Sequence, residues 1–327
     1  MKILLLISLA SFVLSLIFGL LIIPLLKKLK VGQPILKYVS EHKTKGGTPT
    51  MGGIFFILST VISCLIFNSF ESKIWVTCLV IIVGFSLVGF IDDFIKIKSK
   101  NNEGLKPLQK TIFQIIIAFI ASIYAYLSGL DFLYIPFTTN IIHLKWAIIP
   151  LNVFVFLSAV NGVNLLDGLD GLSSGVSTIY FLAIGAIILI ELNINSHFYL
   201  VINEYVNVVN ICFSLAGSLL AFLVFNVSKA SVFMGDTGSL ALGGGVAAIS
   251  LMTGNTLYIP IIGLAYVITV LSVIIQVLYY KKTKKRVFLM APLHHHFQHL
   301  GFSESKIAYF YMIATLFIAV LAIFFIL

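Results

Sequence analysis

The sequence predicts an all-α, polytopic membrane protein, folded as a single integral-membrane domain over residues 1–327. Hydrophobic residues make up 60% of the chain and charged residues only 10%, a composition far from that of soluble domains. A helix needs about 20 apolar residues to cross the hydrocarbon core of a bilayer. We count ten such runs, with little chain between them: 3–26, 52–70, 74–91, 111–130, 147–162, 174–192, 206–226, 239–254, 259–280 and 306–327.

The individual segments support this prediction in order. The first run is too long for a signal peptide and is followed by lysines, so we expect a retained membrane helix. The segment 131–146 contains two short β-prone stretches around a Thr-Thr-Asn turn and predicts a small hairpin. The runs 147–162 and 239–254 are short, and we expect them to be tilted, kinked or extended by their flanks. The polar segment 193–205 has room for a short helix.

The basic residues predict the orientation of the chain. With residue 1 outside, the loops 27–51, 92–110, 163–173, 227–238 and 281–305, together with Lys306, carry 18 of the 21 Lys and Arg residues. The positive-inside rule then places both termini outside the cell and these loops in the cytoplasm. We attribute the net charge of +9 to this bias and to attraction for anionic headgroups and phosphates, and we expect no nucleic-acid partner.

Asp92 and Asp93 close the third apolar run, in the segment GFIDDFIK. Charged residues at the edge of a membrane cost free energy, so an adjacent pair favours a functional role. If the helix continues through Lys96, Asp92 and Lys96 share one helix face. Two close carboxylates need a cation nearby to ionise cheaply, and either a lysine or Mg²⁺ would serve. A capped, solvated helix end explains this motif alone equally well.

Three polar residues recur at a spacing of three in NGVNLLDGLDGLSSG: Asn164, Asp167 and Asp170. On a helical turn this spacing places them on one face, while the glycines between them allow close backbone approach. Oxygen ligands of this kind suit hard cations or the hydrogen bonds of a nucleoside. The alternative is a turn rich in Asp and Asn that only joins two helices.

Asp236 lies between two glycines in MGDTGS, just before a predicted helix. Such a turn can direct backbone N–H groups and a helix N-terminus at a phosphate, with the carboxylate left to bind Mg²⁺. The alternative is a plain helix cap formed by Asp236 or Ser239.

Three consecutive histidines, His294 to His296, follow the ninth run in APLHHHF. On a helix they would point in different directions and could not all bind one metal ion, so we expect them to hydrogen-bond a pyrophosphate instead. The basic, Gly- and Pro-rich loop 42–53 could cover a diphosphate. Basic residues after a span are also ordinary topology signals.

Read together, these segments resemble the polyprenyl-phosphate N-acetylhexosamine-1-phosphate transferases and, within them, the phospho-N-acetylmuramoyl-pentapeptide-transferase family. The matching stretches occur in the family's order: GTPTMGG (47–53), DDFIK (92–96), NGVNLLDGLDGL (161–172), FMGDTGS (233–239) and APLHHHF (291–297). The chain departs from the family at Gln298, where Glu is frequent, and at Leu166, where Thr is frequent.

The resemblance implies a Mg²⁺-dependent phosphoryl transfer at the cytoplasmic face of the bacterial cell membrane. Undecaprenyl phosphate attacks the β-phosphate of UDP-MurNAc-pentapeptide, releasing UMP and leaving lipid I in the bilayer. Bringing two anions together needs cations, so charge neutralisation and positioning carry most of such a reaction. Polytopic enzymes of this kind often dimerise, which makes a homodimer a further expectation.

The resemblance also assigns roles to residues. It makes Asp236 the main Mg²⁺ ligand with Asp93 beside it, and it makes Asp92 the base or acid partner of the lipid phosphate. Direct attack is favoured, although a carboxylate acting as a covalent nucleophile stays open. The uridine, sugar or diphosphate would be contacted by Asn164, Asp167, Asp170, Asn226 and Ser239. The phosphate path would be lined by Lys45, Thr50, Lys96, His294 and His295, and Gln276 would reach the same pocket.

Two rival functions stay open at the level of sequence. A sister enzyme that transfers GlcNAc-1-phosphate to the same lipid differs in its UDP-sugar, and GTPTMGG with the uninterrupted histidines argues against it. A secondary transporter also uses acids within membrane helices. Here, however, the acids gather at one predicted membrane face and not at the midplane.

Overall fold

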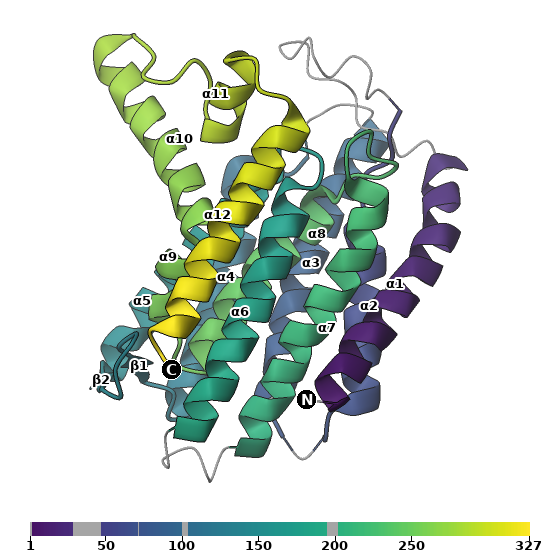
Figure 1. The fold of residues 1–327 in the computed structure, drawn as a ribbon. Coiled ribbons are helices and arrows are strands. Elements are labelled where there is room, and N and C mark those ends of the chain that lie inside the picture. The colour runs from purple at the N-terminus through teal and green to yellow at the C-terminus, as the bar shows by residue number, and fades with distance from the viewer. Residues whose placement is uncertain (1, 29–46, 71, 100–103, 195–201) are drawn as a thin grey trace.

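The computed structural model describes residues 2–28, 47–70, 72–99, 104–194 and 202–327. Within these ranges the chain forms a bundle of long, roughly aligned helices with one short β-hairpin (Figure 1). Both termini and the hairpin lie at one end of the bundle, which we call the lower end. The short helix α11 (Leu293–His299) lies at the opposite, upper end.

A helix coincides with each of the ten apolar runs: α1 (Lys2–Lys28), α2 (Gly53–Phe67), α3 (Ile74–Ser99), α4 (Pro107–Leu127), α5 (Ile148–Leu166), α6 (Leu172–Ile194), α7 (Ile202–Asn226), α8 (Gly235–Met252), α10 (Leu264–Thr283) and α12 (Glu304–Phe324). Eight of these helices, all but α2 and α8, are long and apolar enough to cross a membrane. The protein is therefore a helical, multi-pass membrane protein.

The two remaining helices differ from ordinary spans. Helix α2 has 15 residues, which at 1.5 Å per residue covers about 22 Å, less than the hydrocarbon thickness of about 30 Å. Helix α8 is enclosed by the bundle, and every residue from Thr237 to Met252 is buried. It packs mainly against α3 and α5, so its first turn is held in the interior of the upper half of the molecule.

The predicted run 259–280 is not one continuous helix. It divides into the short α9 (Ile259–Ile262) and α10, with Gly263 between them outside helical geometry. A Cβ at Gly263 would lie 2.6 Å from the Ile259 carbonyl oxygen, so only glycine permits this tight break. Beyond the break, the upper part of α10 leans away from α12 (Figure 1).

The hairpin predicted over 131–146 is confirmed. Strand β1 (Phe132–Tyr134) pairs antiparallel with β2 (Ile141–His143), with Phe132 opposite His143. A 3-10 helix (Lys145–Ala147) then leads directly into α5. In the segment 193–205, α6 ends at Ile194 and α7 begins at Ile202, and the prediction of a short helix between them lies outside the described residues.

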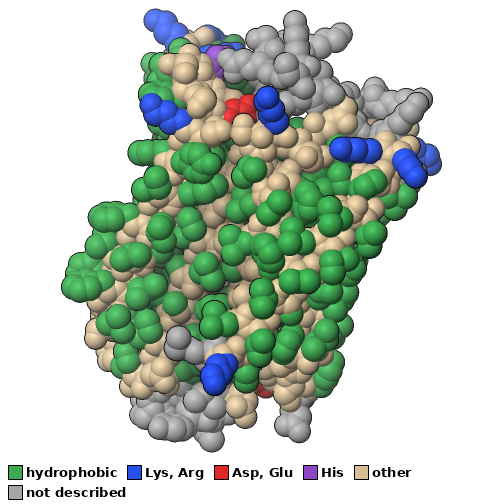
Figure 2. Space-filling model, turned by 45° about the vertical axis from the view of Figure 1, so that its right-hand side comes forward, with side chains coloured by type: hydrophobic (Ala, Val, Ile, Leu, Met, Phe, Trp, Pro, Cys, Tyr) green, Lys and Arg blue, Asp and Glu red, His purple; other side chains and the backbone are tan. Residues whose placement is uncertain are grey.

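The outer surface carries the pattern expected of a protein surrounded by lipid. Figure 2 shows hydrophobic side chains over most of one face, with Lys and Arg side chains along its upper margin. Large apolar side chains such as Leu5, Leu20 and Phe317 point outward and are about two-thirds exposed. Such an extensive apolar surface is rare on soluble monomers, but a bilayer would cover it.

Candidate active site

Three aspartates from two helices meet at the upper end of the bundle. Helix α3 continues past Asp92 and Asp93 to Ser99, and both carboxylates are buried. Asp236 lies in the first turn of α8. One oxygen from each of the three carboxylates lies within 4.8 Å of the others. Because α3 and α8 are packed side by side, residues separated by more than 140 positions form one acidic cluster.

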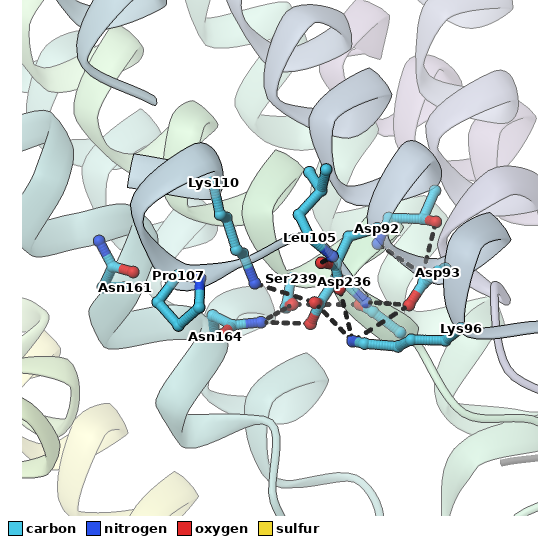
Figure 3. A network of polar contacts seen from close by, with 12 residues as sticks. Asp92, Asp93, Lys96, Leu105, Pro107, Lys110, Asn161, Asn164, Asp236 and Ser239 are labelled. Carbon is cyan, nitrogen blue, oxygen red and sulfur yellow. Dashed lines mark hydrogen bonds and ion pairs between the residues drawn. The ribbon is translucent and has the colours of Figure 1, made fainter. Parts of the chain in front are cut away.

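Two lysines neutralise this cluster (Figure 3). The Lys96 ammonium lies 2.5 Å from Asp92 Oδ2 and 2.8 Å from Asp236 Oδ2, which confirms that Asp92 and Lys96 share one helix face. Lys110, in the first turns of α4, lies 2.9 Å from the same Asp236 oxygen. In the sequence Lys110 is only one of several charges in a basic loop, and nothing there singles it out as a partner of Asp236.

Asp93 anchors the start of α8. Its Oδ2 accepts hydrogen bonds from the Thr237 amide at 2.9 Å and the Thr237 hydroxyl at 2.7 Å. Its Oδ1 accepts a hydrogen bond from the Asp236 amide at 3.2 Å. A carboxylate at a helix N-terminus satisfies free N–H groups and is stabilised by the helix dipole. Asp93 therefore fixes the position of Asp236. Its contact with Thr237 could not be foreseen from the sequence.

Asn164 and Ser239 orient Asp236 from the opposite side. The Asn164 amide donates hydrogen bonds to Asp236 Oδ1 at 2.7 Å and to the Ser239 hydroxyl at 2.8 Å. The Asp92 carboxylate is oriented as well, because the Leu105 amide donates to its Oδ1 at 2.8 Å. Each of the three carboxylates in the cluster therefore accepts at least one hydrogen bond from another residue of the protein.

The prediction that Asn164, Asp167 and Asp170 share one helical face is wrong. Helix α5 ends at Leu166, so only Asn164 is helical, and the two aspartates lie in the following turn. Gly171 adopts a positive φ of 74° there, a conformation that glycine reaches without strain. The turn nevertheless brings Asp167 close to the cluster. Burial and the charges of Asp236 and Asp93 raise the pKa of Asp167 well above its usual value.

Asp170 and Asn226 connect the loops around the site. Asp170 Oδ2 accepts a hydrogen bond from the Ala230 amide at 3.2 Å. The Asn226 oxygen accepts from the Gly171 amide and the Ser174 hydroxyl, each at 3.1 Å, and its NH₂ group donates to the Val232 carbonyl at 3.0 Å. Both side chains hold the turn after α5 against the segment after α7, and their contact with a substrate stays a prediction.

The histidine segment forms the helix α11, and its three imidazoles take different surroundings, as predicted. His294 is fully buried, and neither ring nitrogen has a hydrogen-bond partner within the described residues. Burial and the neighbouring His295 lower the pKa of His294 to about 3, so its imidazole is neutral at physiological pH. His295 Nδ1 lies 2.6 Å from Gln298 Oε1, so Gln298 orients this histidine.

Gly168 lies where α11 packs against the turn after α5. A Cβ added at Gly168 would lie 2.5 Å from His294 Nε2 and 3.1 Å from His295 Nε2. The turn that carries Asp167 therefore packs directly against these two imidazoles. The structure thus brings together the aspartates, Asn164 and the histidines that the sequence singled out.

Three further predicted residues lie around the site. Thr50 is buried, and its hydroxyl has no hydrogen-bond partner in the described part of the chain; a Cβ at Gly235 would lie 2.7 Å from it. Gln276 bonds the backbone of Val287 and Phe288 at 3.0–3.2 Å, bracing the loop before α11. Lys45 lies outside the described residues, so its predicted role is untested.

The acidic cluster fits a hard divalent cation. The donor set consists of carboxylate oxygens, with the unpartnered Thr50 hydroxyl close by. Mg²⁺ prefers such oxygen ligands and binds through one or two carboxylates together with substrate phosphates. The residues present could hold Mg²⁺.

Comparison with known proteins defines the class of this fold and site. Residues 74–254 match the family model described as glycosyl transferase family 4. This range runs from the start of α3 to just beyond α8 and contains the aspartate cluster, Asn164 and Lys110. The match covers more than half of the chain, which therefore belongs to the class of glycosyl transferases of family 4.

Relatives narrow this class further. The chain is 44% identical over 306 residues to a phospho-N-acetylmuramoyl-pentapeptide-transferase of Clostridium perfringens (strain SM101 / Type A), covering 93% of this chain and 91% of the relative. Enzymes of the same name from Clostridioides difficile (strain 630) and Bacillus subtilis (strain 168) are 41% and 40% identical, each covering 97% of this chain and 95% of the relative. The chain belongs to the phospho-N-acetylmuramoyl-pentapeptide-transferase family.

Proposed function

We propose that this protein transfers phospho-MurNAc-pentapeptide from UDP-MurNAc-pentapeptide to undecaprenyl phosphate, with Mg²⁺ as cofactor, producing lipid I and UMP for peptidoglycan synthesis. The observation that carries this proposal is the cluster of Asp92, Asp93 and Asp236, neutralised by Lys96 and Lys110 at one end of an apolar bundle. An acceptor phosphate at the membrane surface and a nucleotide from water can both reach such a position.

In the proposed reaction, an oxygen of the lipid phosphate bonds to the β-phosphorus of the nucleotide, and the bond from that phosphorus to UMP breaks. Asp92, held by Leu105 and Lys96, takes any proton left on the attacking phosphate oxygen. Lys96 and Lys110 balance the charge of the two anions as they approach. Mg²⁺ held by Asp236 and Asp93 would supply further charge neutralisation at the diphosphate.

Other side chains would position the substrates. Asn164 and Ser239 keep Asp236 oriented. Neutral His294 would donate a hydrogen bond to the diphosphate from beside Gly168. The Nδ1–H group of His295 is bonded to Gln298 Oε1, so His295 would donate from Nε2 in its protonated form. We assign contacts with the nucleotide or its sugar to the residues that surround the cluster: Lys45, Thr50, Asp167, Asp170, Asn226 and Gln276.

We further propose that the ten helices that coincide with the apolar runs, the short α2 included, span the bacterial cell membrane as one domain, with both termini outside and the aspartate cluster facing the cytoplasm. In support, the termini lie at the end of the bundle opposite the cluster (Figure 1), and most basic residues follow the upper ends of helices. A homodimer stays a prediction, which light scattering of the purified protein would test.

The test is release of UMP by purified, detergent-solubilised protein given UDP-MurNAc-pentapeptide, undecaprenyl phosphate and Mg²⁺. We expect UMP only when the lipid is present, and EDTA should stop its release. Turnover of UDP-GlcNAc in place of the pentapeptide substrate would identify the sister reaction and overturn the substrate assignment. Uptake of substrate into sealed vesicles without UMP release would instead indicate a transporter.

A further inference from the structure

A groove runs along the outside of the bundle between α10, α11 and α12. It consists of two cavities of about 200 and 130 Å³ that share Phe297 and Phe310. The groove begins at Lys306 in the first turn of α12 and reaches Ile318 farther down the same helix. Its wall is otherwise almost entirely apolar and includes Leu264, Ile268, Leu293, Ile307 and Ala314.

The dimensions of this groove match one hydrocarbon chain. Lys306 and Ile318 are twelve residues apart on α12, a separation of about 18 Å at 1.5 Å per residue. The groove opens because α10 leans away from α12 beyond the break at Gly263 (Figure 1). An extended acyl chain that filled it would cover apolar surface that neighbouring helices leave exposed, such as Phe310, which is 65% exposed.

A positive charge marks the upper end of the groove. The Lys306 ammonium lies 4.9 Å from the centre of the Phe302 ring, and both residues line the upper cavity. Among the residues that the structure describes, no acidic side chain lines either cavity. A chain inserted from the bilayer would therefore meet an ammonium group at the level where a lipid headgroup begins, which favours a headgroup of negative charge.

We propose that this groove binds one acyl chain of an anionic phospholipid from the surrounding bilayer, with the lipid phosphate paired with Lys306. The acceptor lipid of the reaction is a poorer occupant. The cations beside the aspartate cluster are Lys96 and Lys110, and Lys306 has no part in the network of Figure 3. A phosphate held by Lys306 would not be placed to react.

The position of the groove gives the bound lipid a structural consequence. Helix α11 has only seven residues, and it contributes Phe297 to the groove and His294 to the contact with Gly168. A chain packed against Phe297 would brace this short helix and so hold the two imidazoles at the aspartate cluster. Anionic lipid would therefore support both the order of α11 and the activity of the site.

The test uses quenching of tryptophan fluorescence by phospholipids brominated on the acyl chain. Phe310→Trp places the reporter in the groove, in a Trp146→Phe background that removes the exposed native tryptophan; Trp75 is buried. We expect brominated phosphatidylglycerol to quench at a mole fraction several-fold lower than brominated phosphatidylcholine. Lys306→Gln should abolish this difference, whereas Lys27→Gln should preserve it, because Lys27 is also an exposed lysine but lies at the end of α1.

Three outcomes would overturn the proposal. If both lipids quenched equally while Lys306 is present, the groove would have no preference for anionic lipid and would only contact the bulk bilayer. Persistence of the preference in Lys306→Gln would remove the phosphate contact. Undecaprenyl phosphate could also displace the brominated lipid and so restore the fluorescence. If it did so at a lower mole fraction than unbrominated phosphatidylglycerol, the groove would belong to the acceptor lipid. If Phe310→Trp does not fold, Phe302→Trp supplies a second reporter at the upper end of the groove. The fluorescence of either reporter can be measured whether or not the protein is catalytically active.

Discussion

At the scale of single residues, the site is organised around one oxygen atom. Asp236 Oδ2 contacts the ammonium groups of both Lys96 and Lys110, at 2.8 and 2.9 Å. The other oxygen of Asp236 accepts the Asn164 amide at 2.7 Å. Two like charges converge on one carboxylate oxygen only when the surrounding negative charge is large. The same negative charge would draw in Mg²⁺ and, with the lysines, the phosphates of the substrates.

Replacing Asp92 tests its role toward the lipid phosphate. Asp92→Asn keeps the shape of the side chain and its acceptor for the Leu105 amide, but removes the charge and the base. We expect turnover to fall by about 100-fold or more, as for loss of a general base, while nucleotide binding changes little. Steady-state UMP release and nucleotide titration measure the two effects. A variant that lost only nucleotide affinity would move Asp92 to the other substrate.

His294 gives the fold a predictable pH dependence. Its pKa is lowered to about 3 in the folded chain from 6.5, its ordinary value. Between these values only the unfolded chain takes up the proton, so stability falls as the pH drops below 6.5, by up to about 1.4 kcal/mol per pH unit. We expect His294→Gln to lose less thermal stability than the wild type between pH 7.5 and 5.5.

The matched control for this measurement is His143→Gln, at an exposed position of the hairpin. This variant should follow the wild-type dependence of melting temperature on pH. Identical slopes for the wild type and His294→Gln would show that His294 is not buried in its neutral form.

At the scale of elements, the site depends on how closely α3 and α8 approach each other. Gly89 on α3 lies one turn before the aspartate pair, and a Cβ there would overlap the Asp236 carbonyl. A Cβ at Gly53 on α2 would likewise overlap the backbone of Gly238 on α8. Small residues at helix contacts allow backbones to come together in a membrane. The glycines therefore set the distance between Asp92, Asp93 and Asp236.

Gly89→Ala should separate the two halves of the cluster. We expect a loss of about 1–3 kcal/mol of stability from overpacking and a larger proportional loss of UMP release, because the three carboxylates no longer converge. Melting temperature and turnover measure the two effects. Gly84→Ala on the same helix is the control, since a Cβ there meets only ordinary contacts of 3.6 Å or more. Equal behaviour of the two variants would contradict this role for the glycine.

The sequence predicts the elements better than the connections between them. Ten apolar runs predict ten helices because hydrophobicity is a local property, and the pairing of Asp92 with Lys96 follows from helical spacing alone. Lys110 could not be found in this way, since it reaches Asp236 across 126 positions through the packing of α4 beside α3. The three-residue spacing predicts a shared helical face for Asn164 and Asp167, which the end of α5 at Leu166 rules out.

At the scale of the whole molecule, polar chemistry and the apolar surface are segregated. The aspartate cluster and α11 occupy the upper end, both termini occupy the lower end, and apolar side chains cover the surface between them (Figures 1 and 2). This arrangement lets one substrate approach from water at the upper end and the other from the plane of the bilayer.

Cysteine labelling in intact cells tests the proposed orientation. The three native cysteines, Cys64, Cys78 and Cys212, are buried, so they should react little with a membrane-impermeant maleimide. We expect Thr139→Cys in the hairpin to be labelled from outside, and Lys282→Cys at the end of α10 only after the cells are permeabilised. The opposite pattern would place the aspartate cluster outside the cell and contradict the proposed topology.

In the proposed function, the acidic cluster at the start of α8 is the metal-dependent reaction centre. The most direct measurement is Mg²⁺-dependent UMP release by Asp236→Asn. The control is Asp131→Asn, which makes the same substitution at the lower end of the molecule. We expect Asp236→Asn to fold but to stay almost inactive at every Mg²⁺ concentration, and Asp131→Asn to keep the wild-type rate. Activity near the wild type in Asp236→Asn, with an unchanged response to Mg²⁺, would contradict it.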